Sequence, residues 1–186
     1  MKKLMLGLMM AFAVTAEAKT IDGINYDFNF GAGTATITGY NIANPPTKVD
    51  VAEVEGDRGE KCTVTSVGMN AFSDCGSLTS VSLPNATTIG ESAFSTCEKL
   101  ASISLPNATT IVRNAFTGCG LTSVSLPNAT TIQRAAFEGC SSLTLVSLPN
   151  ATTIGENAFY QCGSLTSVSL PNATTIGRVR FLCAKS

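Results

Sequence analysis

Residues 78–97 read LTSVSLPNATTIGESAFSTC, and this pattern returns along most of the chain. The eight residues SLPNATTI occur five times without change, beginning at Ser82, Ser104, Ser125, Ser147 and Ser169. Six phenylalanines follow the same rhythm, spaced 22, 22, 21, 22 and 22 residues apart: Phe72, Phe94, Phe116, Phe137, Phe159 and Phe181. A constant period in the low twenties is typical of a solenoid, in which each repeat forms one coil.

Each repeat predicts one short strand and a return turn. Val81 alternates with Ser80 and Ser82, so the valine points inward and the two serines point outward. Pro84 ends the strand. We expect a right-handed solenoid of about five coils, each adding roughly 4.8 Å along the axis, with parallel strands. The buried set should be Leu78, Val81, Leu83, Ile89 and Phe94 with their repeat equivalents, and the phenylalanines should stack.

One repeat is a residue shorter than the others. It reads Cys119-Gly120-Leu121 where the preceding repeat reads Cys97-Glu98-Lys99-Leu100. The deletion spares the apolar positions on either side of it. It therefore lies in a turn that tolerates a change in length.

Composition excludes several classes of function. The 186 residues contain 12 Lys and Arg, 13 Asp and Glu, and no histidine. A net charge of −1 offers no basic surface to a phosphate backbone, so we expect no nucleic-acid partner. The absence of histidine excludes catalysis by an imidazole base and zinc sites with histidine ligands. No spacing pairs two carboxylates among Asp27, Asp50, Glu53 and Asp57, so we predict no enzyme activity, no metal and no cofactor.

Residues 1–18 have the features of a signal peptide. Two lysines precede the apolar run Leu4–Thr15, which leads to Ala-Glu-Ala, a small-residue cleavage pattern. The run is too short to span a bilayer as a helix. We therefore expect an exported chain that begins near Lys19, secreted or at the cell surface, with no membrane insertion after cleavage.

Residues 19–61 predict a β capping region, and residues 62–186 predict the repeat array. Ile24–Phe30 and Thr34–Tyr40 alternate in hydropathy and are joined by Gly31–Gly33, which is typical of a β-hairpin. We expect this hairpin to cover the first coil and protect its open edge.

The last repeat is incomplete. Arg180 stands where the other units have alanine, and Cys183 follows Phe181 by two residues instead of three. We expect fraying after Ile176 or end-to-end self-association, because the final coil would expose the apolar set Leu165, Val168, Leu170 and Phe181.

The pattern L-x-x-V-S-L-P-x-x-x-x-x-I-G-x-x-A-F-x-x-C resembles the BspA-like leucine-rich repeats, over about residues 62–181. That family occurs on secreted and surface proteins of mucosal bacteria and some parasitic protists. The resemblance implies a leucine-rich repeat solenoid. It also implies an adhesin-like protein whose partners are host extracellular proteins or microbial surface proteins.

Two repeated residue types allow alternative interpretations. The seven cysteines could form a metal ladder or stacked disulfides, but a single column lacks the C-x-x-C knuckle and its Cβ vectors do not face one another. We interpret them as small buried thiols: Cys62, Cys75, Cys97, Cys119, Cys140, Cys162 and Cys183. Five Asn-Ala-Thr triplets match the N-glycosylation acceptor, but a stack about 5 Å apart is too crowded for five glycans. We interpret these asparagines as turn residues: Asn85, Asn107, Asn128, Asn150 and Asn172.

The outward side chains of the repeat strands form the candidate protein-binding face. We expect one continuous, nearly uncharged sheet, in which Leu145 is the single apolar residue and the best candidate for a contact anchor. The residues of this face are Ser80, Ser82, Ser102, Ser104, Ser123, Ser125, Leu145, Ser147, Ser167 and Ser169. The opposite edge carries varying charges that we interpret as a solvated rim: Glu91, Arg113, Gln133, Arg134, Glu156 and Arg178. Two alternatives to a binding role are a structural surface spacer without a specific ligand and an ice-binding or surface-binding hydroxyl array.

Overall fold

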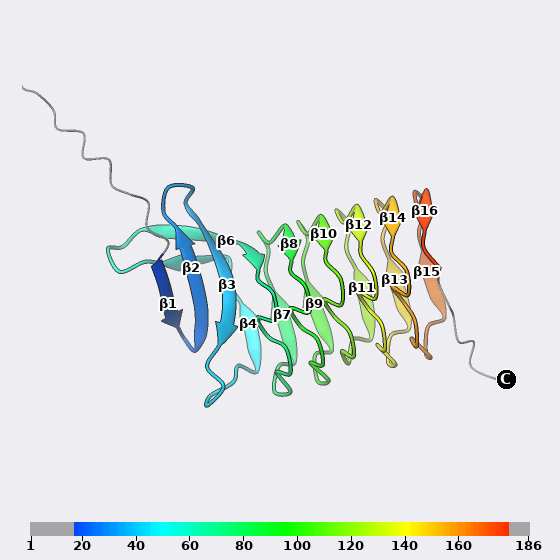
Figure 1. Cartoon of the computed structure of the whole chain (residues 1–186), viewed down its shortest axis with the longest axis horizontal. Helices are drawn as coiled ribbons and strands as arrows, with labels where there is room; N and C mark the ends of the chain where they lie inside the picture. Colours follow the sequence, from blue (N-terminus) through cyan, green and yellow to red (C-terminus); the bar gives the residue numbers. More distant parts are fainter. Residues whose placement is uncertain (1–16, 179–186) are drawn as a thin grey trace, which may run out of the picture.

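The computed structural model describes residues 17–178, which form sixteen β-strands and no helix (Figure 1). No segment of this described part could cross a membrane as a helix. Six strands precede the repeats: β1 (Glu17–Ile21), β2 (Ile24–Asn29), β3 (Thr34–Tyr40), β4 (Lys48–Asp50), β5 (Glu53–Glu55) and β6 (Lys61–Val67). Each of the five repeats then adds two strands, one on either side of the coil.

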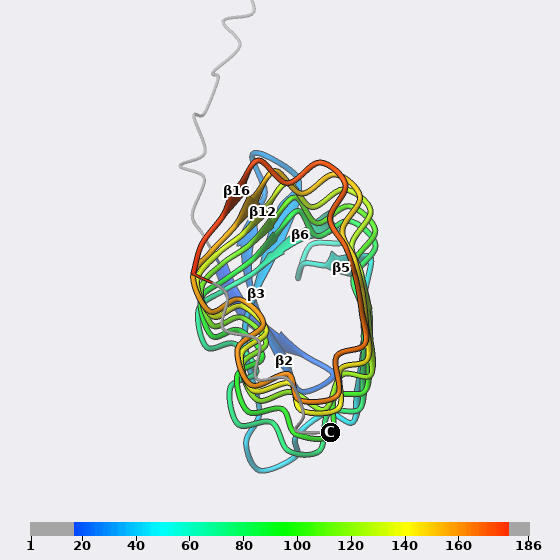
Figure 2. The same cartoon turned by 90° about the vertical axis from the view of Figure 1, so that its right-hand side faces the viewer.

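We name the two sets of repeat strands by their outward residues. The serine strands are β7 (Ser80–Ser82), β9 (Ser102–Ser104), β11 (Ser123–Ser125), β13 (Leu145–Ser147) and β15 (Ser167–Ser169). The threonine strands are β8 (Thr88–Ile89), β10 (Thr110–Ile111), β12 (Thr131–Ile132), β14 (Thr153–Ile154) and β16 (Thr175–Ile176). Seen along the long axis, the coils superimpose as a stack of closed loops (Figure 2). The predicted solenoid of about five coils is confirmed.

Stacked phenylalanines form a buried column along the array. Neighbouring rings from Phe72 to Phe159 lie nearly parallel, with centroids 5.2–5.6 Å apart. Leu78, Val81, Leu83, Ile89 and Phe94 are all buried, as their positions in the repeat predict. Each coil buries several such side chains against its neighbours, and that burial is the main favourable contribution to folding.

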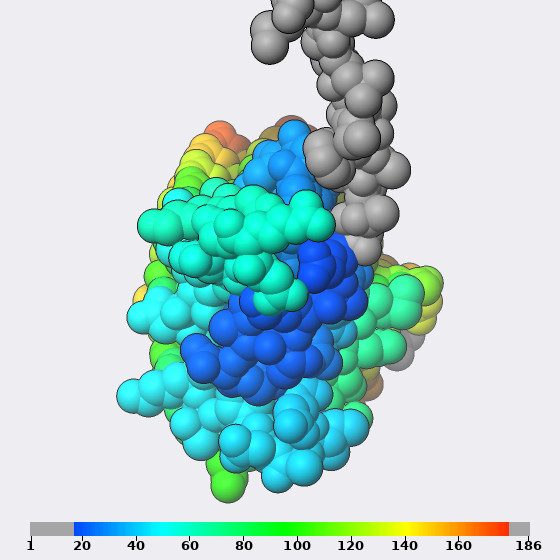
Figure 3. Space-filling view, turned by 90° about the vertical axis from the view of Figure 1, so that its left-hand side faces the viewer, coloured from blue at the N-terminus to red at the C-terminus, as the bar shows by residue number. Residues whose placement is uncertain are grey.

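The β2–β3 hairpin covers the first coil, as predicted. β2 and β3 are antiparallel, and β3 pairs in parallel with β6, which pairs with the first threonine strand. Tyr40 of β3 stacks on Phe72 at 5.9 Å and so ends the aromatic column. The hairpin and the strand β1 outside it close this end of the molecule (Figure 3). β1 includes Glu17 and Ala18 of the predicted leader, and the cleavage site stays a prediction.

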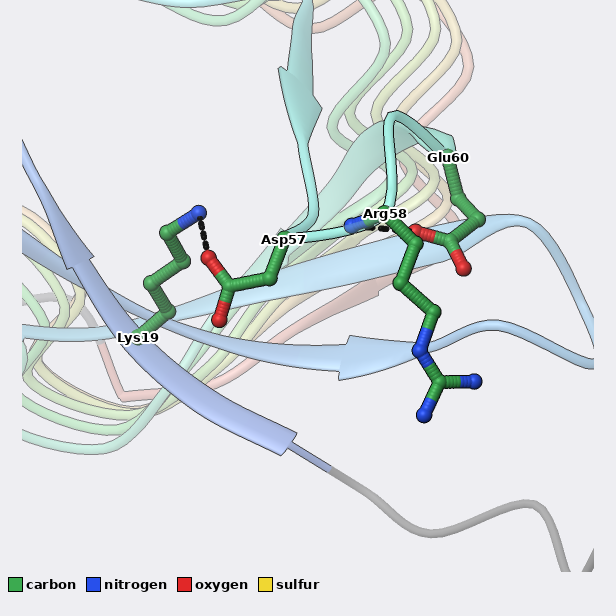
Figure 4. A network of polar contacts seen from close by, with 4 residues as sticks. All are labelled: Lys19, Asp57, Arg58 and Glu60. Carbon is green, nitrogen blue, oxygen red and sulfur yellow. Dashed lines mark hydrogen bonds and ion pairs between the residues drawn. The ribbon is translucent and has the colours of Figure 1, made fainter.

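A loop between β5 and β6 fastens β1 to the cap (Figure 4). Lys19 of β1 forms an ion pair with Asp57, and this contact holds the pKa of the Asp57 carboxyl below its usual value. The Arg58 amide donates to Glu60 Oε2 at 3.1 Å. Gly56 leaves room for Phe30, because a Cβ there would lie 2.8 Å from the ring. The charged residues of this loop therefore have a structural role.

The prediction of one continuous serine sheet is wrong at one junction. The threonine strands belong to a sheet that runs unbroken from β1 to β16. The serine strands are divided between two three-stranded sheets, β7 and β9 with β4 in one and β11, β13 and β15 in the other, with no pairing between β9 and β11 in the described chain. This break coincides with the 21-residue repeat.

The missing residue explains the break. A Cβ on Gly120 would lie 2.2 Å from the Glu98 carbonyl oxygen, whereas the equivalent Gly76 and Gly163 have nothing within 4 Å. The shortened turn thus draws the backbone against the preceding coil, and β11 does not reach the register that pairing with β9 requires.

The C-terminal coil is only partly covered. Leu165, Val168 and Leu170 are half-buried, and Ile176 is 55% exposed. Arg180, Phe181 and Cys183 lie outside the described residues, and the predicted fraying after Ile176 stays a prediction.

Candidate binding surface

The serine strands present their predicted residues outward. Ser102, Ser104, Ser123, Ser125, Ser167 and Ser169 are exposed, and Ser80, Ser82 and Ser147 are half-buried. The residue between each pair is buried or half-buried against the core, from Val81 in β7 to Val168 in β15. Within each three-stranded sheet the outward residues stand in register, so they form two parallel columns. We call this surface the serine face.

Leu145 is the apolar member of these columns. It pairs in register with Ser123 and Ser167, and it is 47% exposed. An exposed leucine on a rigid strand can fill a complementary hollow in a partner at little entropic cost, because its backbone is already fixed.

The serine hydroxyls of this face have no hydrogen-bond partner in the part of the chain that the structure describes. On the other side of the coil, the threonine one residue before each threonine strand is engaged, whereas the outward threonines of the strands themselves, such as Thr110, have no hydrogen-bond partner among the described residues. Thr109 Oγ1, for example, donates to the Thr87 carbonyl at 3.2 Å, and the same bond recurs from coil to coil. The serines are therefore free to donate to and accept from a partner, whereas this threonine column holds coils together.

The repeated asparagines form another ladder. Asn107 Nδ2 donates to the Pro84 carbonyl at 2.8 Å, and Asn128, Asn150 and Asn172 repeat this contact at 2.7–2.8 Å. Nδ2 is the atom to which an N-linked glycan would be joined. Its use between coils supports the interpretation of these residues as turn asparagines.

The cysteine column is buried. Its Sγ–H groups donate to the phenylalanine carbonyl of the preceding coil at 3.0–3.1 Å, from Cys97, Cys119, Cys140 and Cys162. Burial raises the pKa of Cys140 to about 12 and that of Cys162 to about 11. Because the thiolate is the reactive form, this rise in pKa disfavours reaction at Cys140 and Cys162. No disulfide joins the six cysteines within residues 17–178, and they fill a turn as predicted.

The charged edge partly neutralises itself. Arg113 forms a 2.7 Å ion pair with Glu91 one coil earlier, and this contact raises the pKa of the arginine. A depression of about 310 Å³ beside the pair is lined by both signs of charge, from Glu91, Arg113, Arg134 and Glu138 among others. The edge thus carries no strong field of either sign.

Two outward residues of the serine face were not predicted from the sequence. Lys48 and Asp50 of β4 pair in register with Ser80 and Ser82, so they begin the two columns. Val49 between them is buried. The polar–apolar–polar order of Lys48-Val49-Asp50 matches Ser80-Val81-Ser82, and this alternation is the signal that could have identified them.

A family comparison assigns the repeats. Residues 65–185 match the model described as "BspA type Leucine rich repeat region", in six copies. This match covers well over half of the chain. The chain belongs to the BspA-type leucine-rich repeat family. No match was found among the curated proteins.

Solved structures of bacterial leucine-rich repeat proteins have the same fold. A leucine-rich cell surface protein of Faecalibacterium prausnitzii is 27% identical with a TM-score of 0.62, and the match covers 88% of this chain and 51% of that protein. A leucine-rich repeat protein of Bacteroides ovatus is 30% identical with a TM-score of 0.60, over 82% of this chain and 47% of that protein. The leucine-rich repeat protein of T. pallidum is 28% identical with a TM-score of 0.57, and the match covers 87% of this chain and 64% of that protein. This BspA-type chain therefore spans about half to two thirds of the length of these relatives.

Proposed function

We propose that this BspA-type chain is an exported, surface-associated binding protein that attaches to host extracellular proteins or microbial surface proteins through its serine face. The observation that carries the proposal is the row of exposed serine hydroxyls without partners inside the described chain. A rigid strand face with free donors and acceptors and almost no charge can contact a partner at a low desolvation cost.

Two further observations support this proposal. The signal-peptide pattern of residues 1–18 favours export, and one relative is a cell surface protein by its description. A repeat array also multiplies weak contacts, because every coil that engages makes the next contact intramolecular. An open strand face favours binding over catalysis, because it does not enclose a small substrate.

The test compares two sets of lysine substitutions on opposite sides of the coil. Ser104→Lys, Ser125→Lys and Leu145→Lys together place three charges on the serine face. The control places three on the threonine strands: Thr110→Lys, Thr131→Lys and Thr153→Lys. Both variants change the net charge equally, so electrostatic attraction at long range is matched.

Binding would be measured by surface plasmon resonance against purified matrix and bacterial surface proteins. The serine-face variant should bind at least about tenfold more weakly than the wild-type chain, since contacts at the centre of an interface cost most when disrupted. The control should bind normally, and circular dichroism should show that both fold. Equal binding by both variants would refute the serine face. A wild-type chain that binds nothing would favour the structural spacer.

A further inference from the structure

β4 extends the serine face by one strand at its cap end. Lys48 begins the column that continues through Ser80 and Ser102, and Asp50 begins the column of Ser82 and Ser104. The three strands β4, β7 and β9 lie side by side in Figure 1 and form one hydrogen-bonded sheet.

The charges of Lys48 and Asp50 are available to a partner. Both residues are exposed. The two ion pairs found in residues 17–178 join Lys19 to Asp57 and Arg113 to Glu91, so neither involves them. The outward residues of the five serine strands are serines and one leucine, which carry no charge. Lys48 and Asp50 are therefore the charged residues of this face, and they are well placed to discriminate between partners.

A depression lies in front of these strands. Its volume is about 330 Å³, and it is lined by β4, β7 and β9 with the outward residues Lys48, Asp50, Ser80, Ser82, Ser102 and Ser104. Ile103, which also lines it, is half-buried. The site thus combines a cation, an anion, free hydroxyls and a small apolar patch, over three strands.

The spacing of the two charges restricts the ligand. Residues at alternate positions of a strand point to the same face about 6.6 Å apart. A second extended segment with one acidic and one basic residue at alternate positions has the same spacing.

We propose that the β4–β7–β9 end of the serine face is a recognition subsite for an extended protein segment that carries one acidic and one basic side chain at alternate positions. The acidic side chain pairs with Lys48 and the basic one with Asp50, while the serines bind the polar groups between them. Segments with two acidic or two basic residues are repelled at one of the two charges. This subsite rests on the proposed function, because it selects the partner that the whole face then holds.

The test uses four blocked five-residue peptides that differ only at two alternate positions. Threonines occupy the other three positions, and the two variable positions hold glutamate and lysine, two glutamates, two lysines or two glutamines. Each is titrated into the full chain while the backbone amide signals of Lys48, Val81 and Ile103 are followed by NMR. The matched control is the variant Lys48→Gln with Asp50→Asn, which keeps the size of both side chains.

The glutamate–lysine peptide should bind about fivefold more tightly than the glutamine peptide at low salt. The reason is that each exposed ion pair raises the binding constant by a factor of roughly 1.5 to 5, and this peptide forms two of them. The preference should disappear at about 0.5 M salt and in the control variant. The subsite is overturned if the four peptides bind equally, if none shifts these amides at millimolar concentration, or if the preference survives in the variant. Should the serine-face lysine variant lose attachment while the Lys48→Gln, Asp50→Asn variant keeps it, the proposed function stands and the subsite falls.

Discussion

The serine strands and the threonine column that directly precedes the threonine strands carry similar hydroxyl side chains but use them differently. Thr109 and its equivalents donate to a carbonyl of the preceding coil, whereas the serine hydroxyls have no partner within the described residues. The residue types alone do not separate the two roles. What separates them is whether a neighbouring coil already satisfies the side chain.

The two sides also respond differently to the 21-residue repeat. β10 and β12 stay paired across it, with Thr110 opposite Thr131, while β9 and β11 do not pair. The Leu83 amide donates to the backbone carbonyl of Ser104, and the Leu126 amide donates to that of Ser147. Within the described chain, the equivalent bond from the Leu105 amide to the Ser125 carbonyl is missing. A change in length is thus absorbed on the side where the deletion lies, and the shared core stays in register.

The largest expected effect comes from the core that both sides share. Phe116 is fully buried between Phe94 and Phe137, with ring centroids 5.2 and 5.3 Å away. Phe116→Ala should lower the free energy of unfolding by about 3–5 kcal/mol, because it leaves a cavity in the column. Urea unfolding followed by circular dichroism would measure this, with Phe116→Leu as a milder control. Amide hydrogen exchange should become faster in both the serine strands and the threonine strands. If it became faster in only one of the two sets, the two sets of strands would not share one cooperative core.

The next effect separates the two sides. Gly120→Ala places a Cβ 2.2 Å from a backbone oxygen and should cost about 1–3 kcal/mol, because backbone must move. Gly76→Ala is the matched control, since Gly76 occupies the same place in its repeat and has open space around it. Similar unfolding midpoints for the two variants would contradict our explanation of the break in the serine sheet.

Features that recur in every repeat could be predicted from the sequence, whereas features that occur once could not. The position of Phe94 in a 22-residue period indicates that it is buried and stacked, because every coil must bury the same side chains against its neighbours. The outward position of Leu145 follows from alternation in the same way. The break between β9 and β11 does not follow, since it depends on how close two backbones come when one residue is lost. Lys48 and Asp50 were missed because β4 lies outside the repeats and has only its alternation in common with them.

Restoring the missing residue should repair the serine sheet. A serine inserted between Gly120 and Leu121 recreates the Cys-Gly-Ser-Leu order of residues 75–78 and 162–165. We expect a gain of about 1–2 kcal/mol, from roughly two new hydrogen bonds between coils. The amides of Leu105 and Thr122 should become protected from hydrogen exchange. In the variant with the inserted serine, Gly120→Ala should hardly change the free energy of unfolding. If Gly120→Ala is still destabilising there, the deletion is not the reason for the close approach at Gly120.

The smallest effect tests the contrast between engaged and free polar groups directly. Asn128 Nδ2 donates to the Pro106 carbonyl at 2.8 Å, whereas the hydroxyl of Ser125, three residues earlier, has no partner within residues 17–178. Asn128→Ala should therefore cost about 1 kcal/mol in unfolding free energy, and Ser125→Ala should stay within about 0.5 kcal/mol of the wild type.

Binding should show the reverse order, because a side chain that holds coils together is not available to a partner. Asn128→Ala should leave attachment to the surface-plasmon-resonance panel unchanged, while Ser125→Ala should weaken it by about two- to tenfold, the value of one hydrogen bond. If Ser125→Ala destabilises the chain as much as Asn128→Ala does, the serine is structural after all. If both variants bind as the wild type does, the free hydroxyl at this position takes no part in recognition, and the serine face is held by other residues along its columns.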